Sequence, residues 1–420
     1  MRKQVDQQGK GTIGRILNDG TLIEMIYDPM FEKGNFAIKI EDQPVQVINK
    51  IQDPMTKVLY TPLIDNSVST GHFLFPSEVH IWPETISTIF NRICSYIRKY
   101  IDIDEDCISI AASFAMMTHV YDRFEKVPYL RFFGPHGSGK SRALAIMRSI
   151  CYHSINLGAS QTAPNVFRAL DSLGTGTLFL DEANFLDTSR TSDMTKILND
   201  GYSRDGVVYR CDPRTNETKP YRVFSPKVLA NHTSYDDPAL ESRMLTIHMK
   251  PSPRKDIPLY LPNLEYLPDA VEIRNTLLHY RLAHFYSINL EQKFEKLTVF
   301  DARAQEITLP LLWAQELDEV PDYLMRYLRN LQSSRKERQM LDEDAIVADI
   351  VSSLMANSRF SVTLTDVRSL VFNKGQIDLP FKRLGHYLRQ FGATSIKSNQ
   401  GYKFNLHSIN TEFLKSRYGL

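Results

Sequence analysis

Residues 134–141 read Gly-Pro-His-Gly-Ser-Gly-Lys-Ser, which matches the phosphate-loop pattern G-x-x-x-x-G-K-[ST] in full. Triphosphate chemistry explains these residue types. Glycines let backbone N–H groups turn toward the β-phosphate, Lys140 reaches the β and γ oxygens, and the Ser141 hydroxyl coordinates Mg²⁺. The segment, called the P-loop below, therefore predicts binding of ATP with Mg²⁺. The expected contacts are Gly134, Gly137, Ser138, Gly139, Lys140 and Ser141.

The sequence on either side of the P-loop supplies the expected context. Residues 128–133 are an aromatic and aliphatic run of strand type, and residues 141–151 repeat apolar side chains at helical spacing. Strand, loop and helix in this order predict an α/β fold with a P-loop core. The alternative is a glycine-rich turn with an incidental lysine.

A second candidate element follows at residues 177–180, an apolar run that ends in Asp181 and Glu182. It is typical of a buried parallel strand. Asp181 is expected to hold Mg²⁺ through water, and Glu182 to polarise the attacking water as general base. Many strands end at a solvated acidic turn, so this signal is weak alone. The P-loop makes it a candidate Walker B strand.

Two further strands and a helix carry polar residues at their ends. Residues 226–230 are expected to form a strand that ends at Asn231. Arg243 immediately precedes another apolar strand, and Arg303 lies at the start of an apolar helix. This succession resembles the AAA+ ATPases. The resemblance implies that Asn231 is sensor 1, Arg243 an arginine finger and Arg303 the sensor 2 arginine.

Within AAA+, residues 105–315 resemble the minichromosome maintenance helicases and the related or primase-associated replicative helicases of phages and mobile genetic elements. The resemblance implies an ATP-dependent DNA helicase or translocase in replication. It also implies a ring, expected to be a hexamer, in which Arg243 reaches the γ-phosphate of a neighbouring subunit. Two alternatives stay open: an origin-binding replication initiator without processive unwinding, and a regulatory or protein-remodelling AAA+ ATPase.

The pattern along the chain predicts four parts. Residues 1–80 are short strands separated by turns and predict a β-rich domain. Residues 81–250 predict leading helices and the AAA+ core, 251–335 a small helical lid and linker, and 336–420 a winged helix. Within the third part, the proline-rich stretch 251–268 is expected to be a connection and the charged stretch 329–338 an exposed linker.

The composition of the C-terminal part differs from that of the rest. Residues 351–420 carry ten Lys or Arg against three Asp or Glu, whereas the whole chain has a net charge of only +1. Helices followed by a hairpin predict a winged helix that binds duplex DNA. A protein-interaction module with a solvated basic face is the alternative. The expected DNA contacts are Lys382, Arg383, Arg389, Lys397 and Lys403.

A hairpin is predicted inside the core, where residues 206–212 and 221–224 flank a polar turn. The resembled helicases insert a DNA-contacting hairpin at this position, between Walker B and sensor 1. The resemblance therefore implies that Arg214 and Lys219 track single-stranded DNA in a central pore. An exposed turn with ordinary charges is the alternative.

Composition and cysteine spacing argue against a membrane protein, a secreted protein and a zinc-binding protein. No segment is long and apolar enough to predict a membrane span, and residues 1–6 lack the apolar core of a secretory signal, so a cytoplasmic protein is expected. The four cysteines lie far apart and form no zinc-type spacing.

Overall fold

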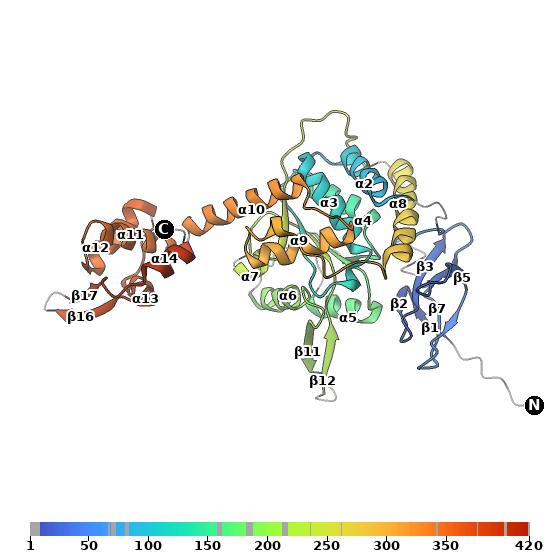
Figure 1. Cartoon of the computed structure of the whole chain (residues 1–420), viewed down its shortest axis with the longest axis horizontal. Helices are drawn as coiled ribbons and strands as arrows, with labels where there is room; N and C mark the ends of the chain where they lie inside the picture. The colour runs from blue at the N-terminus through green and yellow to red at the C-terminus, as the bar shows by residue number, and fades with distance from the viewer. Residues whose placement is uncertain are drawn as a thin grey trace, which may run out of the picture. The chain divides into compact units, whose positions relative to one another are not determined.

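The computed structural model describes residues 9–65, 68, 73–79, 84–157, 162–181, 188–211, 217–235, 237–261, 263–341, 343–375, 377–398 and 401–418. The chain divides into two compact units, residues 1–325 and residues 326–420 (Figure 1). The predicted Walker B glutamate, Glu182, and the hairpin residue Arg214 lie outside the described residues.

The N-terminal part of the first unit consists of two small sheets. One is antiparallel in the order β2-β3-β4-β5, and the other has the order β1-β7-β6. Ile23, Met25 and Phe36 are fully buried and form the centre of this β-rich region. The strands are β1 (Lys10–Thr12), β2 (Gly14–Ile16), β3 (Leu22–Asp28), β4 (Lys33–Lys39), β5 (Gln46–Ile48), β6 (Ile51–Gln52) and β7 (Leu59–Pro62).

Two helices lead into the core. Helix α2 (Ile86–Tyr100) begins at Thr85, whose hydroxyl accepts a hydrogen bond from the backbone N–H of Thr88. It buries one apolar face, whereas α3 (Glu105–Thr118) is buried on nearly all sides. Helix α3 is therefore an interior helix of the first unit.

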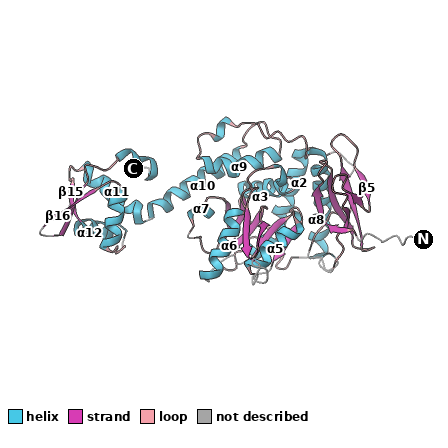
Figure 2. Cartoon of the chain, turned by 90° about the horizontal axis from the view of Figure 1, so that it is seen from below, coloured by secondary structure: helices cyan, strands magenta, loops and turns pink. Residues whose placement is uncertain are grey.

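The core is a mixed α/β structure built on five parallel strands in the order β14-β8-β13-β10-β9. Both faces of a parallel sheet are normally covered, which explains why most residues of these strands are apolar and buried. Figure 2 shows the strands enclosed by helices. The elements are β8 (Tyr129–Phe133), α4 (Lys140–Ile150), β9 (Ser154–Leu157), α5 (Ala163–Leu173), β10 (Thr177–Leu180), α6 (Thr188–Asp200), β13 (Lys227–Asn231), α7 (Pro238–Glu241) and β14 (Met244–His248).

A separate two-stranded hairpin interrupts the core between α6 and β13. Its strands, β11 (Val207–Cys211) and β12 (Thr218–Arg222), pair antiparallel with Val207 opposite Arg222. Figure 1 shows the hairpin projecting beyond α5 and α6.

The expectation of an irregular connection at 251–268 is wrong in its second half, because α8 (Asn263–His284) begins at Asn263 and contains Pro268. Burial of Ala270, Ile273 and Leu277 stabilises this helix despite the proline. Helix α9 (Ala302–Ala314) begins at Asp301, whose carboxylate accepts from the backbone N–H of Ala304.

The stretch 329–338, expected to be an exposed linker after the last helix of the lid, is itself helical, because it lies within α10 (Asp322–Leu341). Its Leu, Arg, Lys, Glu, Gln and Met residues are all strong helix formers, so a polar stretch can still be a helix.

The second unit packs helices against a three-stranded antiparallel sheet in the order β15-β17-β16. Its core includes Val351, Val367, Leu384, Leu388 and Phe404. The elements after α10 are α11 (Glu343–Ala356), β15 (Ser361–Thr363), α12 (Leu364–Gly375), α13 (Phe381–Gln390), β16 (Thr394–Ser398), β17 (Gly401–Asn405) and α14 (Thr411–Tyr418). Among the described residues of the whole chain, no helix has the length and hydropathy needed to cross a membrane.

Candidate active site

The P-loop connects the end of β8 to the start of α4, and its backbone requires glycine. Gly137 and Gly139 have φ angles of 76° and 88°, in the left-handed region that other residues rarely adopt. A Cβ added to Gly134 would lie 2.4 Å from the carbonyl oxygen of Met249. The loop is thus shaped so that its N–H groups and the amino end of α4 are available to an anion.

Lys140 is held across this loop. Its Nζ donates to the carbonyl oxygens of Gly134 and Pro135 at 2.8 and 2.7 Å. The Ser138 hydroxyl donates to the Pro135 carbonyl at 2.8 Å, which braces the same turn. The lysine ammonium therefore lies where it can exchange carbonyl oxygens for phosphate oxygens.

The strand order brings the other predicted residues to this place. Strands β8, β13 and β10 are neighbours and parallel, so the P-loop, Asn231 and Asp181 follow one edge of the sheet. They line a cavity of about 330 Å³, which falls in the size range of ligand sites. The lining residues are His136, Gly137, Gly139, Lys140, Ser141, Arg142, Asp181, Ala230, Asn231 and His232.

Asn231 has unused hydrogen-bonding capacity in this cavity. It is 1 % exposed, and neither Oδ1 nor Nδ2 makes a hydrogen bond of normal geometry with the described residues. Burial raises the pKa of the Tyr235 hydroxyl, and the nearby Asn231 side chain offsets part of that rise. An unpaired buried amide costs about 1–3 kcal/mol, so a ligand or ordered water is expected to complete it.

Two side chains of the cavity could hold Mg²⁺, namely Ser141 and Asp181. No group of three His, Cys, Asp or Glu residues with metal-binding geometry occurs within the described part of the chain. Mg²⁺ is usually bound by one or two protein oxygens together with phosphates and water, which this pair could provide.

Arg243 does not line this cavity. It immediately precedes β14, and Met244 at the start of that strand pairs with Tyr129 at the start of β8. The P-loop begins after the other end of β8, five residues further on. At about 3.3 Å per residue, the Arg243 backbone lies about 16 Å from the P-loop of its own chain.

The Arg243 side chain packs on Tyr202, and so does Arg303 from α9. Their guanidinium carbons lie 5.4 and 5.1 Å from the centre of the tyrosine ring. These distances are typical of cation–π contacts. Nε and Nη1 of Arg243 are buried and have no hydrogen-bond partner among the described residues.

Glu306 completes this group of side chains. Its carboxylate accepts from Lys126 Nζ and Arg303 Nη1, both at 2.6 Å, and from the Tyr202 hydroxyl at 3.3 Å. Burial acts to raise the pKa of Glu306, but Lys126 and Arg303 outweigh it, so the pKa falls. We call these residues the Tyr202 cluster: Lys126, Tyr202, Arg243, Arg303 and Glu306.

Sequence reasoning missed Lys126, Tyr202 and Glu306 as functional candidates. Lys126 and Tyr202 belong to no motif and lie far apart in the chain, whereas Glu306 lies three residues after Arg303 on α9. Arg303, predicted to be the sensor 2 arginine, lies beside Arg243 in this cluster and does not line the P-loop cavity.

The predicted DNA contacts occur in both units. Lys219 is exposed on β12 of the hairpin, and Lys382 is exposed on α13. Arg383 Nε lies 3.0 Å from a Glu343 carboxylate oxygen, and Arg389 stacks over Phe404 at 5.9 Å. Lys403 is exposed on β17, and the Lys397 side chain lies outside the described residues.

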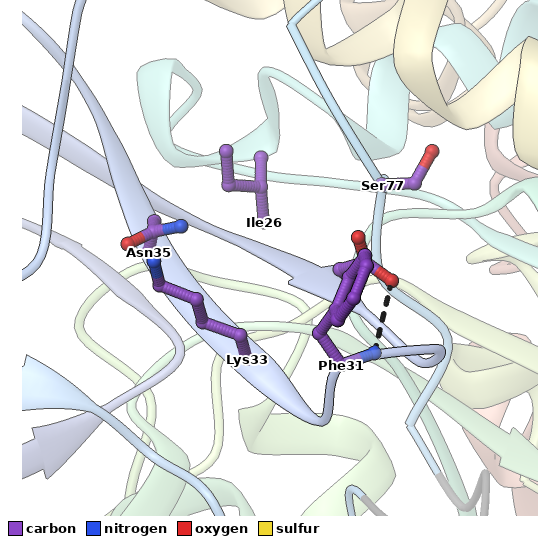
Figure 3. Close-up of a pocket in the computed structure, with 6 residues that line it drawn as sticks. Ile26, Phe31, Lys33, Asn35 and Ser77 are labelled. Atoms are coloured by element: carbon purple, nitrogen blue, oxygen red, sulfur yellow. Dashed lines mark hydrogen bonds between the residues drawn. The ribbon is translucent and has the colours of Figure 1, made fainter.

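A larger cavity, of about 410 Å³, lies on the N-terminal strands and is lined by Ile26, Asp28, Phe31, Lys33, Asn35 and Ser77 (Figure 3). Asp28 accepts from the backbone N–H of Phe31 at 3.4 Å, which holds the turn. None of the predicted site residues lines this cavity. The smaller cavity at the P-loop is therefore the candidate active site.

No protein-family model and no curated protein matches the sequence. Among solved structures, the chain is similar to the apo C-terminal region of NrS-1, with a TM-score of 0.40 and 10 % identity over 92 % of this chain and 96 % of that one. It is also similar to the JCV helicase, with a TM-score of 0.30 and 16 % identity over 56 % of this chain and 62 % of that one. At this degree of likeness, neither structure decides what the chain does.

Proposed function

We propose that this protein is an ATP-dependent DNA helicase or translocase of the AAA+ type that acts in DNA replication as a ring, with a hexamer expected. The observation that carries the proposal is the position of Arg243. It is separated from the P-loop of its own chain by the whole length of β8. An arginine finger at this position would serve the ATP of a neighbouring subunit.

Each ATP would then lie between two chains. One chain contributes the P-loop, Asp181, Glu182 and Asn231, and its neighbour contributes Arg243. The guanidinium group of Arg243 is expected to meet the charge that develops on the γ-phosphate. Because Arg303 shares the Tyr202 ring with Arg243, we propose that it acts on the same neighbouring ATP.

Within the P-loop half of the site, each residue has a separate task. Lys140 binds the β and γ oxygens, Asn231 orients the attacking water or the γ-phosphate, and Glu182 accepts the proton of that water. Mg²⁺, held by Ser141 and by Asp181 through water, would neutralise the phosphate charge.

DNA is proposed to bind in two places. The β11–β12 hairpin, with Arg214 and Lys219, would follow a single strand in the pore. The second unit is proposed to be a winged helix that recruits duplex DNA through Lys382, Arg383, Arg389, Lys397 and Lys403, and its net charge over residues 351–420 favours this.

A forked-duplex assay with ATP and Mg²⁺ tests the proposal, with Lys140→Ala as the control. The helicase predicts strand displacement that depends on ATP and is absent from the control. DNA-stimulated ATP hydrolysis without displacement would favour the replication initiator, and hydrolysis indifferent to DNA would favour the regulatory or protein-remodelling ATPase.

A further inference from the structure

The short connection between α6 and the hairpin passes through the Tyr202 cluster. It contains Gly201 and Tyr202, and β11 begins at Val207. Tyr202 is 2 % exposed, and its carbonyl oxygen accepts from the backbone N–H of Val127, just before β8. The tyrosine is thus fixed between the hairpin and the first strand of the core.

Lys227 joins the base of the hairpin to this connection. Its side chain is fully buried at the start of β13, and Nζ donates to the carbonyl oxygens of Val223, Ser225 and Gly201 at 3.1, 3.0 and 3.1 Å. Val223 and Ser225 follow β12 directly, and Gly201 precedes Tyr202. One side chain therefore links the end of the hairpin to the residue beside the ring.

The packing at this link leaves no free space. A Cβ added to Gly201 would lie 2.4 Å from Lys227 Nζ and 2.5 Å from the Val223 carbonyl oxygen. The Tyr202 ring also meets the Tyr129 ring edge to face, with centroids 6.4 Å apart. Closely packed groups transmit displacement instead of absorbing it, so a shift of the hairpin base is expected to move the Tyr202 ring.

We propose that Tyr202 is a positioning residue that couples the β11–β12 hairpin to Arg243 and Arg303. Its ring holds both guanidinium groups, so a hairpin that engages DNA sets their position toward the ATP of the neighbouring subunit. This inference rests on the proposed function and names how DNA regulates that site. A displacement of about 1 Å can cost about a hundredfold in rate, so the coupling needs only a small movement.

The ring, and not the hydroxyl, is the part that contacts both arginines. Tyr202→Leu removes the ring, whereas Tyr202→Phe keeps it and removes only the hydroxyl, with its interactions with Glu306 and Arg303. We expect Tyr202→Leu to lower the kcat of DNA-stimulated ATP hydrolysis by about 10- to 100-fold, with little change in KM for ATP. Tyr202→Phe should remain within about threefold of wild type.

A mixing experiment separates positioning from a loss of fold. Tyr202→Leu subunits keep Glu182, and Glu182→Gln subunits keep Tyr202 and both arginines. Mixed assemblies should therefore show more DNA-stimulated hydrolysis than either variant shows alone. Absence of rescue in assemblies verified to contain both chains would overturn the proposal.

Lys227→Met tests the link to the hairpin, because methionine has similar length and lacks the three donors. Its stimulation of hydrolysis by single-stranded DNA should fall at least fivefold, while hydrolysis without DNA persists. Lys196→Met, at an exposed lysine of α6, is the matched control and should behave as wild type. Equal DNA stimulation in Lys227→Met and wild type would overturn the coupling.

The measurement on the wild-type protein distinguishes failure of the proposed function from failure of the proposed role of Tyr202. If wild-type hydrolysis does not respond to DNA, the proposed function fails and the coupling fails with it. If wild-type hydrolysis responds and Tyr202→Leu responds equally, the proposed function stands and only the role of Tyr202 is overturned.

Discussion

Glu24 on β3 and Arg281 on α8 form an ion pair in which both side chains are 1 % exposed. Arg281 Nε donates to Glu24 Oε1 at 2.7 Å, and the same guanidinium donates to both carboxylate oxygens of Asp122. The pair ties the N-terminal β-rich region to helix α8. Removing one partner would leave a buried charge, a change that typically costs about 3–5 kcal/mol.

Two neutral histidines adjoin this pair and give stability a dependence on pH. Burial lowers the pKa of His119 to about 3, and the pKa of His153 falls well below its ordinary value for the same reason. Burial raises the pKa of Glu24 to about 7, although Arg281 opposes the rise. Arg274, Asp122 and Tyr152 lie around the same groups.

The histidine and glutamate effects have opposite signs. Below about pH 6.5, His119 and His153 become protonated in the unfolded chain but stay neutral in the folded one. The free energy of unfolding therefore falls on acidification, by up to about 1.4 kcal/mol per pH unit for each histidine. Between about pH 7 and 4.5, Glu24 contributes the opposite slope. The net expectation is a loss of stability on acidification.

His119→Gln should flatten the dependence of the free energy of unfolding on pH between pH 6.5 and 5, and Glu24→Gln should steepen it. Urea unfolding at several pH values measures both, and unchanged slopes would refute the assignment.

Substitutions in the P-loop half of the site should separate binding from chemistry. Lys140→Ala should weaken ATP binding by about 10- to 100-fold, because a charge-assisted contact is lost. Glu182→Gln should keep the affinity and lower kcat by about 10²- to 10⁴-fold, because only the base is removed. Equilibrium ATP binding and steady-state hydrolysis check these outcomes. Turnover near wild type in Glu182→Gln would show that the Walker B assignment is wrong.

Arg243 should act only on a neighbouring subunit. Arg243→Ala should lower hydrolysis by about 10³-fold, and mixing it with Glu182→Gln should restore part of the activity. The restored sites pair an intact glutamate from one chain with an intact arginine from the other. Hydrolysis measured against the mixing ratio should peak between the pure variants. Activity that persists unchanged down to a proven monomer would contradict the ring.

The hairpin should control the response to single-stranded DNA. Arg214→Ala with Lys219→Ala should bring the ratio of DNA-stimulated to unstimulated hydrolysis toward one and abolish unwinding, because both contacts are to phosphates. Lys10→Ala with Lys57→Ala removes the same charge from the N-terminal β-rich region and serves as the control. Equal loss of stimulation in both pairs would indicate a general effect of charge and argue against a hairpin in the pore.

Deletion of residues 342–420 should weaken binding to duplex DNA and reduce its dependence on salt. Each phosphate contact contributes about 0.9 to the slope of log affinity against log salt, so loss of several contacts is measurable. Fluorescence anisotropy at increasing NaCl concentrations gives the slope, and analytical ultracentrifugation checks that the remaining chain still assembles. An unchanged slope would favour a protein-docking role for the basic surface.

The P-loop cavity is the part of the molecule that sequence reasoning approached most closely. Each of its predicted residues belongs to a contiguous motif, and parallel strands bring the ends of their motifs to one edge. Lys140, Asp181 and Asn231 accordingly line one cavity, while their roles stay predictions.

The Tyr202 cluster could not be predicted in the same way. Lys126, Tyr202 and Glu306 come from separate segments, and a cation–π contact leaves no periodic pattern in a sequence. The helix α10 was missed for a different reason, because a stretch of charged residues is equally typical of a linker and of a solvated helix.

Strand β8 places the P-loop and Arg243 of one chain at its opposite ends, so each chain in the proposed ring would take part in two ATP sites. In head-to-tail contacts of this kind, every subunit uses two different surfaces, one toward each neighbour. A chain lacking only Lys140 would spoil one site, whereas a chain lacking both Lys140 and Arg243 would spoil two. In a cell that makes intact and defective chains together, such alleles should be dominant. The double variant should inhibit the mixed rings more strongly than the single variant.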